Sequence, residues 1–294
     1  PAPGLHLRRR VLCDRKRACV MAKRPNSMRH LDDAIRRACG GSMERYIHAR
    51  TMMANAIVTS MLPDGVVKGG SALKMRFGEA ATRFTTDLDT ATATDPELYA
   101  QRLDRRLKEG WEGFSGRVVP REPASPEGVP VEYVMQPYDV KLAFMGKPWC
   151  TVSLEVGHNE IGDANEADWV ELADAAALFE EVGLPAPGKA PLMRVEHQIA
   201  QKIHAVTSGG DRARDLADLQ LIARNCDIDL VATKRTCARL FAYRRAQAWP
   251  PVVEKRPGWD ALYAEQASGL SVLQSVEEAV EWVDALIGRI DSAE

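Results

Sequence analysis

Apolar residues at three- and four-residue spacing predict helices along much of the chain. Leu31 and Ile35 lie on one such stripe, and the pair Asp95-Pro96 is typical of a helix start. The predicted helices cover residues 27–39, 42–61, 72–77, 96–109 and 195–206, and three more lie between residues 228 and 294.

Short apolar segments, separated by turns that contain Pro, Gly and Ser, predict strands in the middle of the chain. The predicted strands cover residues 66–67, 87–89, 117–119, 131–135, 138–144 and 151–156. The last two are expected to form an antiparallel hairpin. The pattern therefore predicts an α+β (mixed α/β) fold, in which a small mixed sheet flanked by helices is followed by a helical region.

Changes in composition divide the chain into three predicted parts. Residues 1–26 are rich in Arg, Lys and Pro, which is typical of a flexible basic segment. A linker that contains Pro and Gly at residues 185–188 then separates two folded parts. We expect an α/β domain over residues 27–184 and a mainly helical domain over residues 185–294.

The overall composition is that of a soluble globular protein, with 45% hydrophobic and 27% charged residues among 294. A net charge of −2 means that any RNA-binding surface must be local. Six scattered cysteines without a Cys-x-x-Cys pair argue against a zinc site and predict reduced thiols in the cytoplasm. No apolar run is long enough to span a bilayer, so no membrane association is expected.

The candidate chemistry begins in a glycine turn followed by two acids. Asp87 and Asp89 alternate with Leu88, so both carboxylates project from one face of a strand. Two such acids repel each other unless a cation lies between them, and Mg²⁺ prefers carboxylate and phosphate oxygens. Gly70 and Ser71 precede them at a predicted helix start, where free N–H groups bind anions. Together these residues predict a site for Mg²⁺ and a nucleotide.

Residues 68–73 (KGGSAL), Arg83, Thr85 and residues 87–89 (DLD) resemble the nucleotidyltransferase superfamily, and within it the AbiEii toxin family, which includes the mycobacterial MenT toxins. The resemblance implies a nucleotidyltransferase fold and transfer of a nucleotide from an NTP. Residues 79–82 make the spacing between the turn and the acids slightly long, which leaves the shape of the helix end open.

Members of this superfamily supply a third carboxylate from a later strand, and two residues match it. Glu155 lies between apolar neighbours in a predicted strand, where an acid is costly unless something neutralises it. Asp139 in the preceding predicted strand is the alternative. We expect Glu155 to join Asp87 and Asp89 as a metal ligand.

A second segment resembles the C-terminal motif of the AbiEii family. Lys202 lies on a predicted helix, and a glycine loop leads to Arg214, Asp215 and Asp218. By this resemblance Lys202 would bind the triphosphate as a point charge, and Arg214 would contact the nucleotide. Asp215 would either orient these two cations or touch the nucleotide itself.

The resemblance to MenT-type toxins implies that the chain transfers NMP from an NTP to the 3′ end of tRNA, which would block translation. It also implies a cognate antitoxin protein as a partner. Other members of the superfamily modify proteins or small molecules, and a module that only binds nucleotide or RNA is a further alternative. The acid and lysine positions are all intact in this sequence, which favours an enzyme.

Overall fold

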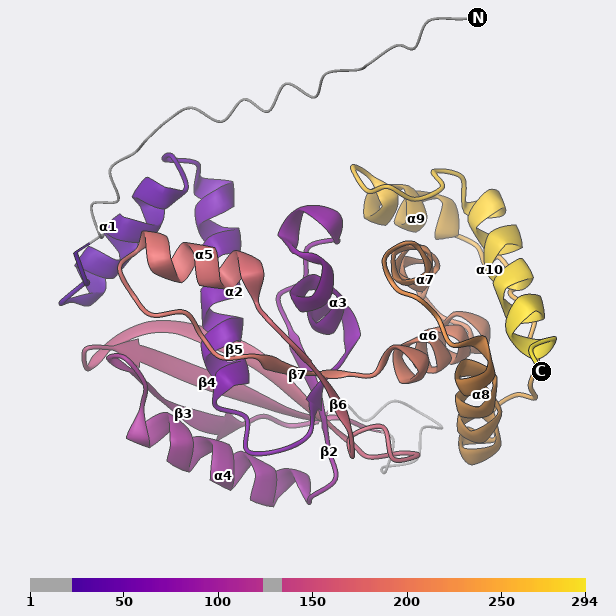
Figure 1. Cartoon of the computed structure of the whole chain (residues 1–294), viewed down its shortest axis with the longest axis horizontal. Coiled ribbons are helices and arrows are strands. Elements are labelled where there is room, and N and C mark those ends of the chain that lie inside the picture. Colours follow the sequence, from indigo (N-terminus) through magenta and orange to yellow (C-terminus); the bar gives the residue numbers. More distant parts are fainter. Residues whose placement is uncertain (1–22, 124–133) are drawn as a thin grey trace, which may run out of the picture.

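The structure, a computed structural model, describes residues 23–123 and 134–294. Most of the basic segment at residues 1–26, and most of the strand predicted at residues 131–135, lie outside the described residues. In the described part, a mixed sheet with helices on both faces lies beside a group of helices from the C-terminal part of the chain (Figure 1). This arrangement confirms the predicted fold class.

The sheet has seven strands among the described residues, in the order β3-β4-β5-β2-β1-β7-β6. The strands are β1 (Val66–Val67), β2 (Leu88–Thr92), β3 (Phe114–Pro120), β4 (Gln136–Phe144), β5 (Lys147–His158), β6 (Ala167–Val170) and β7 (Ala190–Met193). The predicted hairpin is confirmed as the antiparallel pair β4–β5. The central pair β2–β5 is parallel, which brings two distant segments of the chain into register.

Helices α1 (Met28–Ala38), α2 (Met43–Ser60) and α5 (Ala173–Glu181) cover one face of the sheet, and α4 (Pro96–Glu109) covers the other (Figure 1). The start of α4 follows from its sequence, because the Asp95 side chain accepts hydrogen bonds from the backbone N–H groups of Glu97 and Leu98. Gly110 ends the helix with φ +77°, a value that glycine tolerates. Leucines and valines of the central strands, together with apolar residues of these helices, form the core.

The C-terminal part contains α6 (Val195–Ser208), α7 (Arg214–Asn225), α8 (Leu230–Arg244), α9 (Trp259–Ala267) and α10 (Val276–Asp291). The three helices predicted after residue 228 are thereby confirmed. Trp259 and Tyr263 of α9 are fully buried and belong to a second core. Helix α3 (Gly69–Phe77) lies between the two groups of helices (Figure 1) and contributes Leu73 to this second core.

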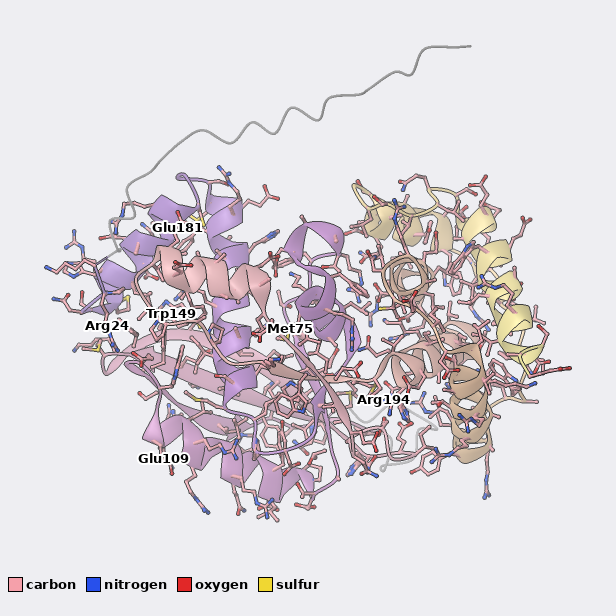
Figure 2. The ribbon with its side chains drawn as sticks, viewed as in Figure 1. Arg24, Met75, Glu109, Trp149, Glu181 and Arg194 are labelled. Carbon is pink, nitrogen blue, oxygen red and sulfur yellow. The ribbon has the colours of Figure 1, made fainter. Side chains whose placement is uncertain are left out.

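The sheet extends further along the chain than the sequence predicts. β7 pairs in parallel with β1, so the sheet continues to Met193, past the predicted domain boundary between residues 184 and 185. Pro191 obscures this strand in the sequence, because proline argues against a strand inside a sheet. Arg194, labelled in Figure 2, lies where the chain leaves the sheet for α6. β6 and α5 were not predicted either.

Two other expectations can be compared with the structure. The cysteines of the described residues, Cys39, Cys150, Cys226 and Cys237, are all free thiols. Every helix in residues 23–123 and 134–294 is too short or too polar to cross a lipid bilayer.

Candidate active site

The glycine turn packs directly against the second acid. The backbone N–H of Lys68 donates to the carbonyl oxygen of Asp89 at 2.8 Å, as β1 runs antiparallel to β2. Gly69 follows with φ +65°, and a Cβ atom there would lie 2.1 Å from Asp89 Oδ2. Glycine is therefore required at this position twice over, by its backbone conformation and by the space that the carboxylate occupies.

The hydroxyl of Ser71 is buried and donates to the backbone carbonyl of Asp87. This bond fastens the first turn of α3 to the segment that carries the acids. Gly70 lies next to the guanidinium of Arg83, because a Cβ atom on Gly70 would be 2.9 Å from Arg83 Nη2. The slightly long spacing between the turn and the acids is taken up by a 3₁₀ turn, Glu79–Ala81.

Two of the three predicted carboxylates are neighbours across the parallel strands. The register pairs Asp89 of β2 with Glu155 of β5, so both side chains lie on the same face of the sheet. Burial raises the pKa of Asp89 to about 6, and the negative charges of Glu155 and Asp87 raise it as well. Lys68 and Lys202 oppose these effects. Asp87 lies just before β2 and is exposed.

The alternative third acid, Asp139, lies one strand further away. Asp139 lies on β4 and pairs with Ser153 of β5, so β5 separates it from β2. Its carboxylate is 3.7 Å from the guanidinium of Arg121. The geometry therefore favours Glu155 over Asp139 as the partner of Asp89.

By themselves, the acids supply only part of the ligands that a magnesium ion needs. Within residues 23–123 and 134–294, no group of three or more His, Cys, Asp or Glu side chains is arranged to hold a metal ion. Mg²⁺ needs only one or two carboxylates when phosphate oxygens and water supply the other ligands. Asp89, half-buried beside two other acids, is destabilised in its ionised form, and a cation would relieve this. The residues fit a metal that arrives with a nucleotide.

The predicted C-terminal motif forms a buried ion cluster. Lys202 of α6 is only 6% exposed, and its Nζ lies 3.0 Å from Asp215 Oδ1 and 2.6 Å from Asp218 Oδ2, both on α7. A lysine held between two buried carboxylates is already neutralised. Lys202 is thus paired with two carboxylates and is not a free charge, and Asp215 contacts it directly. The role of Lys202 toward the triphosphate stays a prediction.

Arg83 joins the same cluster from the other half of the molecule. Its Nε lies 3.2 Å from Asp218 Oδ1 and its Nη2 lies 3.3 Å from Asp218 Oδ2, a two-pronged contact. Although burial raises the pKa of Asp218, Lys202 and Arg83 together lower it below its usual value. The sequence resemblance included Arg83 but gave it no role; its position before the two acids was the available signal.

The basic residue that pairs with Asp215 is Arg212 rather than the predicted Arg214. Arg212 Nε lies 2.8 Å from Asp215 Oδ2. Arg214 is exposed and makes no ion pair with any of the described residues. Arg214 is the first residue of α7, and it is exposed, whereas Asp215 and Asp218 are buried.

Lys68 is a further cation that sequence reasoning did not assign. A Cβ atom on Gly157 of β5 would lie 2.7 Å from Lys68 Nζ. The lysine side chain therefore ends beside β5, at a glycine that leaves room for it. From there it lowers the pKa of Asp89 more than Lys202 does. Two cations from the first half of the chain, Lys68 beside Gly157 and Arg83 beside Gly70, therefore lie near Asp89.

The chain resembles known proteins in sequence and in fold. MenT4, a nucleotidyltransferase toxin from Mycobacterium tuberculosis H37Rv, has a similar fold, with a TM-score of 0.50 and 18% identity over 89% of this chain and 98% of that one. JHP933 from Helicobacter pylori gives a TM-score of 0.42 and 16% identity over 83% of this chain and 91% of its own. No curated protein matches the sequence. Residues 55–284, more than half of the chain, match the family described as nucleotidyl transferase AbiEii toxin, type IV toxin–antitoxin system. The chain therefore belongs to the AbiEii nucleotidyltransferase toxin family.

Proposed function

We propose that this nucleotidyltransferase is the toxin of a toxin–antitoxin pair, and that it transfers NMP from an NTP to the 3′ end of tRNA in a Mg²⁺-dependent reaction in the cytoplasm. The observation that carries the chemistry is the register of Asp89 with Glu155 beside the glycine turn. The acceptor rests on the family, and the predicted block of translation and the antitoxin partner rest on it too.

In this reaction the oxygen of an acceptor hydroxyl attacks the α-phosphorus of the NTP. The bond from the α-phosphorus to the oxygen of the β-phosphate breaks, and pyrophosphate leaves. Glu155, between apolar neighbours on β5, would take the hydroxyl proton or complete a second metal position. The barrier lies mainly in positioning and in charge on phosphate oxygens, so cations are the groups that catalysis requires.

The backbone of Gly70 and the guanidinium of Arg83 lie together at the start of α3, where a triphosphate would meet both a helix N-terminus and a positive charge. Lys202 would influence the phosphates indirectly, because Lys202 and Arg83 both form ion pairs with Asp218. Asp87 and Asp89, with Glu155 nearby, would hold a divalent ion, which would supply positive charge against the phosphate oxygens.

The experiment is transfer from each of four radiolabelled NTPs to total tRNA with Mg²⁺. Glu155→Gln and Asp139→Asn form a matched pair, because both acids lie on the same face of the sheet but only Glu155 adjoins Asp89. We expect labelled tRNA with the wild type and with Asp139→Asn, and a loss of at least about 100-fold with Glu155→Gln.

Other outcomes separate the alternatives. Label on a protein or a small molecule instead of tRNA would contradict the acceptor but keep the transfer chemistry. Nucleotide binding without transfer to any acceptor would favour a module that only binds. Equal losses in Asp139→Asn and Glu155→Gln would contradict the assigned role of Glu155.

A further inference from the structure

A cavity lies between α2, α3 and α5, on the opposite side of α3 from the buried ion cluster. It offers about 160 Å³ of space, close to the roughly 150 Å³ of an engineered cavity that binds benzene, so a small flat ring fits. Met75, labelled in Figure 2, lies on the side of α3 that faces α2 and lines this cavity together with Met52. Thioethers make favourable contacts with aromatic rings, so these walls suit a flat ring.

The polar wall of the cavity contains an amide without a partner. Asn55 of α2 is 4% exposed, and its Oδ1 accepts no hydrogen bond from the residues that the structure describes. A buried amide oxygen left without a partner lowers stability, so a polar side chain in such a place calls for an explanation. A ligand that supplies an N–H group would provide one.

A second acceptor lines the same cavity. Glu79 pairs through Oε2 with Lys74 Nζ at 3.0 Å, while its Oε1 is buried and has no partner among the described residues. Lys74 is itself held over the ring of Phe84, 4.6 Å from the ring centre. Two oxygen acceptors without a described partner, Asn55 Oδ1 and Glu79 Oε1, therefore line the same cavity. They favour a ligand with N–H donors on its edge.

The cavity adjoins the acids of the candidate active site. Ser71 lines it, and the hydroxyl of that serine donates to the carbonyl of Asp87. Thr51 and Asn55 also line a neighbouring hollow that contains Asp87 and Ser153. Thr51 and Asn55 of α2 thus line both the cavity and the hollow that contains Asp87.

We propose that this cavity binds the base of a nucleotide, with Asn55 and Glu79 accepting hydrogen bonds from its exocyclic amino group. Amide and carboxylate side chains are those that read amino groups of adenine and cytosine in other protein–nucleic acid contacts. Guanine also carries an amino group, whereas uracil does not. The inference rests on the proposed function, because the sugar and phosphate of the base would extend to Asp87 and Asp89.

The test measures binding of adenosine, cytidine, guanosine and uridine to the full chain by titration calorimetry. Asn55→Leu keeps most of the side-chain volume and removes the amide, and Glu79→Gln changes the second acceptor independently. Asn165→Leu is the matched control, since Asn165 is exposed and pairs with Asn159 outside the cavity. We expect an amino-bearing nucleoside to bind more tightly than uridine. Asn55→Leu, which removes an acceptor, should weaken it at least tenfold, and Glu79→Gln, which keeps an oxygen acceptor but loses the charge, should weaken it less.

Transfer assays with the four NTPs then identify the source of the base. Loss of NTP preference in Asn55→Leu would assign the cavity to the donor nucleotide. An unchanged NTP preference, with lost preference for the last nucleotide of the acceptor, would assign it to the acceptor. Both results support a base site.

Equal binding of all four nucleosides, no binding, or cavity variants that bind like the wild type would overturn the inference. The titration does not depend on transfer. If the proposed function is wrong, the titration still shows whether the cavity binds a base. If the cavity binds no base, the transfer assay still tests the proposed function. A thermal melt of each variant, with Glu79→Gln as the second variant, separates loss of the site from loss of the fold.

Discussion

Arg83 and Asp218, 135 residues apart in the sequence, meet in a two-pronged ion pair at the boundary between the sheet and the C-terminal helices. Arg83 lies over the backbone of Gly70, and Asp218 also accepts from the ammonium of Lys202. The contact therefore connects the glycine turn to α7. It joins the two halves of the chain at the point where phosphate is expected to bind.

Arg83→Ala should destabilise the protein because it leaves Asp218 buried with only one of its two cations. We expect a loss of about 3 kcal/mol in the free energy of unfolding, measured in urea. Arg121→Ala is the control, because its pair with Asp139 is half exposed and should change the value by less than about 1 kcal/mol. Equal effects of the two substitutions would contradict a linking role for Arg83.

Lys202→Ala should cost both stability and activity. The substitution leaves Asp215 and Asp218 facing each other in a buried place, so we expect a loss of about 3–5 kcal/mol in urea unfolding. Asp215→Asn in the same background should restore part of this loss, because it removes one uncompensated charge. A Lys202→Ala protein with wild-type stability and no activity would instead show that the lysine serves only the substrate.

The acid with a raised pKa predicts a pH dependence. The pKa of Asp89 is about 6 in the folded chain and near 3.8 in the unfolded chain, so the folded state binds more protons between these values. The ionised carboxylate therefore reduces stability, fully above pH 6 and not at all below pH 3.8. Asp89→Asn should raise the melting temperature at pH 7.5, and its advantage should shrink as the pH falls to 5.

Magnesium gives an independent check on the same residue. Mg²⁺ with a non-transferable NTP analogue should raise the melting temperature of the wild type at pH 7.5, because it neutralises Asp89. EDTA should reverse the rise, and Asp89→Asn should show little of it. Asp139→Asn, on the same face of the sheet, should respond like the wild type. Transfer activity should fall as the pH drops below about 6, where Asp89 becomes protonated.

Two glycines beside the acids should respond differently to alanine. At Gly69 the new Cβ would lie 2.1 Å from Asp89 Oδ2 and the backbone has φ +65°, so the carboxylate must move. At Gly157 the nearest atom is the end of a flexible lysine, Lys68 Nζ at 2.7 Å, which can shift aside. We expect Gly69→Ala to lower both melting temperature and transfer strongly, and Gly157→Ala to have a much smaller effect. The reverse order would contradict the close packing of the turn on Asp89.

The helices and most strands could be predicted because their patterns are local. A stripe such as Leu31 and Ile35 encodes a buried helix face, and Asp95-Pro96 encodes a start, without reference to the rest of the chain. β7 could not be predicted in this way, because its pairing with β1 depends on a segment more than 100 residues earlier. Pro191 also hid it.

The sequence by itself determined the identities of the two acids, the glycine turn and the Lys202 motif, because the spacing of these residues is a property of the chain. Only the tertiary structure shows that Glu155, and not Asp139, lies beside Asp89, since the parallel register of β2 and β5 sets these neighbours. It also decided that Lys202 is buried between two carboxylates. Charge, burial and pairing depend on contacts between distant segments, and those exist only once the chain has folded.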